Sequence, residues 1–203
     1  MYLGIDVSQW NLPVDWEAAA KAGVRFAVCR LGWGNGHVDD MFYSHVNHAL
    51  EAGMEIGAYL YSYALDEKEA QEEARFAAAV LKDCGVPAPA MGLWADIEDA
   101  DGYRAGENSI RPDIITGIAR TFMEEWEKAD IPCGIYTCRS WLDNLLVTAA
   151  LPENTPIWCA EWGDTCTWPD AVMWQFTDSL PIGVSRLDGN KARALSLRAM
   201  TGR

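Results

Sequence analysis

The chain of 203 residues is long enough for one large α/β domain, and half of its residues are hydrophobic, which is ample for a core. Its formal net charge of −14 argues against nucleic acid and against an anionic membrane surface, because both normally bind a basic face. No stretch approaches the roughly 18 apolar residues of a transmembrane helix. We therefore expect neither a nucleic-acid partner nor a membrane partner.

Apolar strand-like segments and amphipathic helical segments alternate from the N-terminus onward. Strands are predicted at Tyr2–Val7, Val24–Leu31, Met54–Tyr63, Ala90–Ile97 and Pro132–Thr137. Helices are predicted after them at Pro13–Ala22, Asp39–Ala52, Asp66–Cys84, Pro112–Ala129 and Ser140–Val147, with a polar loop at Asp99–Asn108. Three more strands follow without a helix, at Ile157–Glu161, Val172–Phe176 and Val184–Leu187. The tail after Asn190 is a candidate terminal helix.

This order of elements predicts the fold class. Alternating strands and helices indicate a parallel sheet, either open or closed. Eight strands with about five helices favour closure into a flattened, incomplete (β/α) barrel. An open doubly wound sheet is the alternative, but no GxGxxG motif follows the first strand. Without a linker or an internal repeat, residues 1–203 are interpreted as a single barrel domain.

The six cysteines and three histidines bear on metal binding and on compartment. None of the cysteines forms a CxxC pair. His45 and His48 could share a helix face, but a zinc site needs a third ligand, so we expect two surface histidines and no metal. The N-terminus has neither the basic nor the long apolar region of a secretory signal. We expect free thiols in a protein made in the cytoplasm.

The predicted fourth strand ends in two carboxylates, Asp96 and Glu98. Residues i and i+2 of a strand point to the same face, with Cα atoms about 7 Å apart. Two carboxyl groups in one concave place cannot both ionise easily, so one pKa rises, and a glycosidase needs such a pair. The alternative is a strand that runs into a solvated acidic loop, since Asp99 and Asp101 follow.

Other acids and aromatic residues fall at the ends of other predicted strands. Asp6 follows the first strand and Asp188 the last, and barrel closure would make these two neighbours. Aromatic rings at strand ends include Tyr61, Tyr63, Tyr136, Trp158, Trp162 and Trp174. A barrel mouth with carboxylates and aromatic faces suits a polysaccharide, whereas core packing is the alternative for any single ring.

Short motifs in a fixed order resemble the muramidases of glycoside hydrolase family 25 over nearly the whole chain. They are Gly4–Trp10, Asp15–Trp16, Phe26–Arg30, Gly57–Tyr59, Asp96–Glu98, Gly134–Tyr136, Ile157–Ala160 with Trp162, Trp174–Phe176, and Leu187–Asn190. The chain departs from the family pattern at His45, Leu60, Tyr61 and Gly189, and none of these departures removes a carboxylate. The resemblance implies a flattened barrel with eight strands and five helices.

The resemblance also implies a function and roles for single residues. Glu98 would be the general acid and later the base, and Asp96 would support attack by the substrate's own 2-acetamido group. Asp6 and Asp188 would hydrogen-bond the sugar and raise the pKa of Glu98. The expected substrate contacts are Tyr61, Tyr136, Trp162, Gln175 and Arg30. No cofactor is implied, the partner is bacterial peptidoglycan, and a monomeric lysozyme or endolysin would reach the cell wall after release from the cytoplasm.

Two competing interpretations are weaker. A chitinase-like hydrolase of another barrel family would carry an Asp two residues before the Asp-x-Glu pair, where this chain has Trp94. A non-catalytic module that binds cell-wall sugars should have lost an acid, and all four acids are present.

Overall fold

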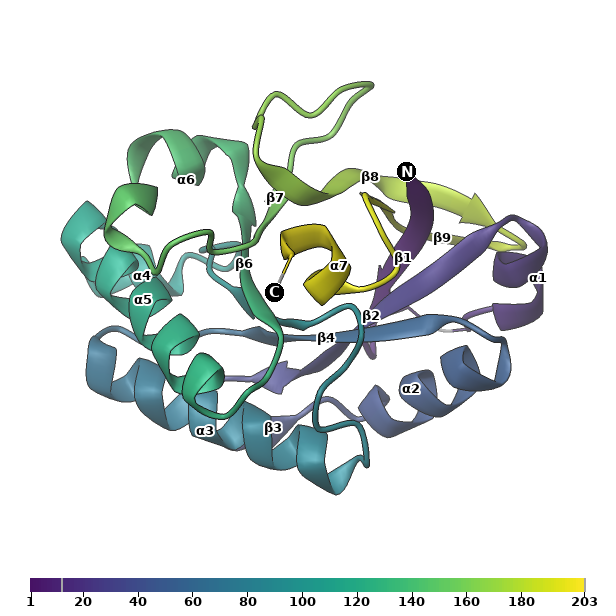
Figure 1. Ribbon diagram of the computed structural model, residues 1–203, viewed down its shortest axis with the longest axis horizontal. Helices are drawn as coiled ribbons and strands as arrows, with labels where there is room; N and C mark the ends of the chain where they lie inside the picture. The colour runs from purple at the N-terminus through teal and green to yellow at the C-terminus, as the bar shows by residue number, and fades with distance from the viewer. Residues whose placement is uncertain (12, 203) are drawn as a thin grey trace.

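The computed structural model describes residues 1–11 and 13–202, so Leu12 and Arg203 of the predicted domain lie outside it. Its centre is a mixed sheet in which eight strands close into a barrel in the order β1-β9-β8-β7-β6-β5-β4-β2, sealed by pairing of β1 with β2 (Figure 1). The predicted barrel is therefore confirmed. The strands are β1 (Tyr2–Val7), β2 (Val24–Trp33), β3 (His37–Val38), β4 (Glu55–Tyr61), β5 (Leu93–Asp96), β6 (Cys133–Cys138), β7 (Ile157–Ala160), β8 (Ala171–Ile182) and β9 (Ser185–Ala192).

The last barrel strand corrects the prediction of a wholly parallel barrel. Strand β9 runs antiparallel to both of its neighbours, β8 and β1, and the short β3 pairs antiparallel with the edge of β2. Only Gly183 and Val184 separate β8 from β9, and a parallel crossover needs about a dozen residues or more. A hairpin therefore closes the barrel. Gly183 adopts a φ of 56°, in the left-handed region that such tight turns require.

The described residues form seven helices, whereas the sequence predicted about five. Five correspond to predicted helices: α1 (Trp16–Lys21), α2 (Phe42–Glu51), α3 (Glu67–Asp83), α5 (Pro112–Lys128) and α6 (Arg139–Asn144). A single turn, α4 (Tyr103–Gly106), lies inside the predicted polar loop, and α7 (Leu197–Thr201) is the candidate terminal helix. A 3₁₀ turn covers Thr148–Ala150. The expectation of about five helices was therefore wrong, and in the described part of the chain no helix is long and apolar enough to cross a membrane.

Local chemistry explains where the long helices begin. The Asp66 carboxylate accepts a hydrogen bond from the Glu69 amide at 2.9 Å, and the Glu69 side chain accepts one from the Leu65 amide at 2.8 Å. This reciprocal capping satisfies two amides that would otherwise lack a partner at the start of α3. Pro112 occupies the first turn of α5, where its fixed φ suits the helix. Its missing N–H costs no hydrogen bond there, because first-turn amides have no acceptor within the helix.

Two apolar clusters fill the fold. The outer cluster lies between the sheet and the helices, and Figure 1 shows α2, α3, α5 and α6 along the outside of the barrel. The inner cluster fills the barrel with large rings: Trp158 lies 5.7 Å from Trp94 and 4.5 Å from Tyr136 between ring centroids. Helix α7 covers the barrel at the start of β5, where the Leu197 amide donates to the Ala90 carbonyl at 2.7 Å. Asp96 is the last residue of β5, so it lies at the end of the barrel opposite α7.

One predicted surface residue is buried. His48 is exposed as expected, but His45 is only 2% exposed. The Nε2 atom of His45 lies 3.2 Å from the Ser8 carbonyl oxygen, and the His45 ring lies 5.7 Å from the Trp16 ring. The prediction failed because α2 turns this face toward the loop after β1, which helical spacing alone does not reveal.

Candidate active site

Four carboxylates meet at the end of the barrel opposite α7. Asp96 is the last residue of β5, Glu98 follows two residues later, and Asp6 lies near the end of β1. Asp188 lies within β9, in register with Asp6. They line one small hollow of about 90 Å³, which we call the acidic hollow; its other lining residues are Tyr59, Tyr136, Trp158 and Gln175.

The strand that carries Asp188 differs in direction from the predicted one. The sequence placed it at the carboxyl end of a parallel strand, but it stands within an antiparallel strand. The expected neighbourhood of Asp6 and Asp188 holds nevertheless, because their Cα atoms are paired across the β1–β9 ladder. Side chains at directly opposed positions project to the same face of a sheet.

Asp6 and Asp188 form one hydrogen-bonded pair. Both Gln175 Nε2, at 3.0 Å, and Asn190 Nδ2, at 2.7 Å, donate to Oδ2 of Asp6. Burial raises the pKa of Asp6, and these hydrogen bonds, with a further one from Asp188, act in the opposite direction. Burial and the neighbouring Asp6 raise the pKa of Asp188 to about 8. Asp188 therefore keeps its proton at neutral pH and donates it in a hydrogen bond to Asp6.

Asp96 and Glu98 both retain protons readily. Burial raises the pKa of Glu98 to about 7, and the negative charges of Asp6 and Asp101 add to this effect. Burial, followed by the charges of Glu98 and Asp6, raises the pKa of Asp96 well above its ordinary value. Among the described residues, Oδ1 of Asp96 is buried without a hydrogen-bond partner. The two carboxyl groups titrate as a unit rather than independently.

Three of the predicted substrate contacts are joined to each other. The Tyr136 hydroxyl donates to Oε1 of Gln175 at 3.1 Å, and the Trp162 indole donates to the same oxygen at 3.3 Å. Gln175 then donates to Asp6. Trp162 is still 63% exposed, so its ring stands at the rim of the acidic hollow. The network fixes the orientation of the Gln175 amide and couples the rim to the acids.

The other two predicted contacts, Tyr61 and Arg30, do not line the acidic hollow. They lie in a neighbouring depression of about 380 Å³, here called the aromatic groove, whose lining is Gln9, Trp10, Arg30, Trp33, Tyr61, Tyr63, Ala100 and Asp101. Arg30 donates to Oδ2 of Asp39 at 2.7 Å, and its guanidinium lies 5.2 Å from the Trp33 ring centroid. The groove adjoins the hollow, because Tyr61 is paired with Asp96 across the β4–β5 ladder.

Arg104 is a functional candidate that the sequence did not reveal. It is 1% exposed, and its Nε donates to the Glu98 carbonyl at 3.1 Å. Its two terminal nitrogens donate to the Ala64 carbonyl and, at 2.7 Å, to the Ser62 carbonyl. The Asp99 carboxylate accepts a hydrogen bond from the Arg104 backbone amide at 2.6 Å. One arginine thus fastens the segment that carries Glu98 to the segment after β4, and a single Arg in a polar loop gives no pattern that predicts this.

Asn190 was also missed as a site residue, although it belongs to the Leu187–Asn190 motif. It is fully buried, and it accepts a hydrogen bond from the Trp158 indole at 2.9 Å while it donates to Asp6. Its side chain therefore connects the inner core to the acids. The sequence Asp-Gly-Asn ordinarily predicts a turn, so it gave no reason to expect that Asn190 donates to a buried carboxylate.

Comparisons with known proteins agree with this geometry. The family model described as "Glycosyl hydrolases family 25" matches residues 5–183. The chain is 24% identical to Lysozyme M1 of Streptomyces globisporus over 217 residues, covering 96% of this chain and 70% of that protein. Its fold is similar to that of the CTP1L endolysin, with a TM-score of 0.81 and 21% identity over 100% of this chain and 70% of that one. It is also similar to the bacterial lysozyme from Streptomyces coelicolor, with a TM-score of 0.75 and 21% identity over 99% and 97% of the two chains. Because the family model spans most of the sequence, the chain belongs to family 25 of the glycosyl hydrolases.

Proposed function

We propose that this glycoside hydrolase is an N-acetylmuramidase, which hydrolyses the β-1,4 bond between N-acetylmuramic acid and N-acetylglucosamine in peptidoglycan. The observation that carries the proposal is the acidic hollow, where four carboxylates converge and one, Glu98, has a pKa raised to about 7. Such a carboxyl group is still partly protonated at neutral pH and can give its proton to a glycosidic oxygen. Family membership and the relative named Lysozyme M1 support the choice of substrate.

Glu98 acts as the general acid and then as the general base. Its half-buried position and the negative charge of Asp6 keep it protonated until the bond to the leaving sugar breaks. The carboxylate left behind can then take a proton from water. A pKa near the working pH suits both steps, because the group must give and regain a proton in each cycle.

Asp96 supports attack by the substrate's 2-acetamido group on the anomeric carbon. Its buried Oδ1 has no partner within the described residues, so it can gain stability from a donor such as the acetamido N–H. In the free protein, burial raises the pKa of both Asp96 and Glu98, whereas this reaction needs the proton on Glu98 and an anion at Asp96. A hydrogen bond from the substrate to Asp96, together with the positive charges of Arg104 and Arg30, favours its anion and leaves the proton on Glu98.

Asp6 and Asp188 hold the sugar and the acid in place, and the aromatic groove receives further sugar units. Aromatic faces such as those of Trp10 and Trp33 pack against sugar rings. We further propose that the enzyme acts on the cell wall as a monomer and without a cofactor. Its net charge of −14 disfavours a nucleic-acid or membrane partner.

Digestion of purified peptidoglycan tests the proposal. The fragments are reduced with borohydride and identified by mass spectrometry, with the Glu98→Gln variant as the control. We expect new reducing ends that are N-acetylmuramic acid, and none with the variant. Reducing N-acetylglucosamine, or free peptides beside intact glycan, would show another specificity. Binding to walls without any cleavage would show a non-catalytic module.

A further inference from the structure

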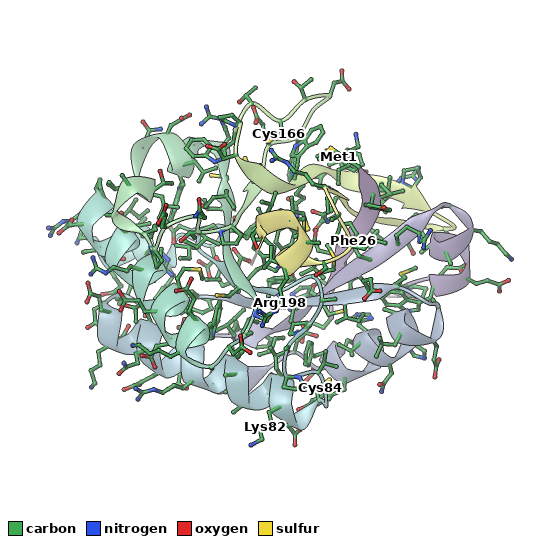
Figure 2. All side chains as sticks on the ribbon, viewed as in Figure 1. Met1, Phe26, Lys82, Cys84, Cys166 and Arg198 are labelled. Carbon is green, nitrogen blue, oxygen red and sulfur yellow. The ribbon has the colours of Figure 1, made fainter. Side chains whose placement is uncertain are left out.

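A second cluster of reactive side chains lies outside the acidic hollow. Cys159 in β7, and Glu161 and Cys166 in the segment between β7 and β8, each bring one ligand atom within 4.8 Å of the other two. Cys159 is buried in the outer cluster, while its neighbour Trp158 belongs to the inner one. Figure 2 shows Cys166 on the loop that rises from β7. Cys159 and Cys166 are thiols rather than a disulfide, and their sulfur atoms lie within 4.8 Å of each other.

The carboxylate of this cluster is already oriented. Thr167 donates to it twice, from its amide to Oε2 at 2.7 Å and from its hydroxyl to Oε1 at 2.8 Å. Arg139 in turn donates to the Thr167 hydroxyl at 2.9 Å, and its guanidinium lies 5.2 Å from the Trp168 ring centroid. Each carboxylate oxygen keeps a free lone pair. Such outer hydrogen bonds are the usual means by which proteins aim a metal-binding carboxylate.

We propose that Cys159, Glu161 and Cys166 form a binding site for a thiophilic divalent cation, of which Zn²⁺ is the best match. Two sulfurs and one oxygen supply three of four tetrahedral positions, and water supplies the fourth. Sulfur ligands disfavour Ca²⁺ and Mg²⁺, which prefer oxygen. The site is separate from the chemistry of the acidic hollow and does not depend on the muramidase proposal.

Charge balance also favours a cation here. Two thiolates and a carboxylate would carry three negative charges, two of which a divalent ion offsets, while the nearby Arg139 guanidinium is shared with Asp143, its ion-pair partner. Binding must release the thiol protons, so affinity rises with pH. The ion would cross-link β7 to the loop that precedes β8. That loop carries Trp162, whose indole reaches Gln175, so the ion would hold the rim of the acidic hollow in place.

Metal binding by the whole chain tests the inference. The protein is reduced, stripped with a chelator, loaded with Zn²⁺ and desalted, and its zinc is measured by atomic emission and by competition with a chromophoric chelator. Co²⁺ is the spectroscopic probe, because tetrahedral thiolate ligation gives sulfur-to-cobalt charge-transfer bands. The test variants are Cys166→Ser and Glu161→Gln, and the matched control is Cys84→Ser. Cys84 is also half-buried but lies on the opposite side of the molecule (Figure 2).

We expect the unaltered chain and Cys84→Ser to hold one zinc ion per molecule and to give the cobalt–thiolate bands. Cys166→Ser and Glu161→Gln should weaken zinc binding, and loss of the hydroxyl in Thr167→Val should cost on the order of 10-fold to 100-fold in affinity. Circular dichroism checks that each variant is folded. If Cys166→Ser does not fold, the isosteric variant Glu161→Gln still tests the site. The inference is wrong if the reduced chain retains no zinc, if both ligand variants bind it like the control, or if cobalt binds without charge-transfer bands.

Discussion

Replacement of Arg104 by methionine should separate the positioning of Glu98 from the simple stability of the barrel. The arginine is buried, and its side chain donates to three backbone carbonyls, those of Glu98, Ser62 and Ala64, and to the Ser62 hydroxyl at 3.1 Å. Methionine has a similar length and leaves these acceptors without their donor. It also removes a positive charge that lowers the pKa of Asp96.

The size of the effect follows from these contacts. A hydrogen bond to a charged group contributes about 1.5–3 kcal/mol, but burial of the guanidinium is itself costly, and burial lowers the pKa of Arg104. The net loss should be about 3–5 kcal/mol, because each buried acceptor left without a donor costs about 1–3 kcal/mol and the guanidinium no longer has to be desolvated. For a chain of this size that corresponds to a fall in Tm of roughly 10 °C, so the variant remains folded at low temperature.

The assay compares kinetics of the folded variant with those of Arg104→Lys. Because the Glu98 backbone loses its anchor, we expect kcat to fall about 100-fold, with little change in KM. Arg104→Lys keeps the charge and a donor, so it should recover part of the stability and of kcat. A lower Tm with unchanged kcat and an unchanged pH profile would refute the positioning role and leave Arg104 as a structural residue only.

Three further predictions concern the carboxylates. Glu98→Gln should lower turnover by about 10²–10⁴ while wall binding and the circular dichroism spectrum persist; substantial remaining turnover would exclude Glu98 as the acid. Asp96→Asn should also be severe, and the product should retain its anomeric configuration by NMR; inversion, or a sugar ester trapped on Asp96, would disprove substrate assistance. Because burial raises the pKa of Glu98 from 4.5 to about 7, its contribution to folding is complete below pH 4.5 and is lost as the pH rises through 7, by roughly 3 kcal/mol at most. Thermal unfolding should therefore show higher stability at pH 5 than at pH 8, with a smaller difference in Glu98→Gln, and an equal difference in both proteins would contradict the raised pKa.

The barrel and its acids were predictable because their signals are local or follow from closure. The strand that ends at Asp96 has apolar residues before its two acids, and ring closure alone brings Asp6 next to the last strand. The direction of that last strand was not predicted, because the second half of β8 is partly exposed and pairs with β9 alone. Its polar residues Asp178 and Ser179 break the apolar pattern that identifies a buried strand.

The unpredicted parts of the site depend on contacts between distant segments. The turn α4 begins because the Asp99 carboxylate accepts two backbone amides, those of Arg104 and Ala105, and no apolar period accompanies it. Arg104 meets its partners at separations of 40 and 42 residues. The sequence predicted that of Asp96 and Glu98 one would be a neutral acid and the other an anion. Which of them holds the proton depends on the burial of each, which only the folded structure defines.

The hairpin that closes the barrel also fixes when, during synthesis, the site can exist. Asp6 lies in the first strand of the barrel, yet Gln175 and Asn190, whose amides donate to it, follow 169 and 184 residues later. Until β9 docks between β8 and β1, both of these strands have open edges and Asp6 lacks its partners. Contacts of such long sequence separation form late and slow folding. A nascent chain that already contains Asp96 and Glu98 therefore has no assembled hollow, and hydrolytic capacity arises only after β9 has been made.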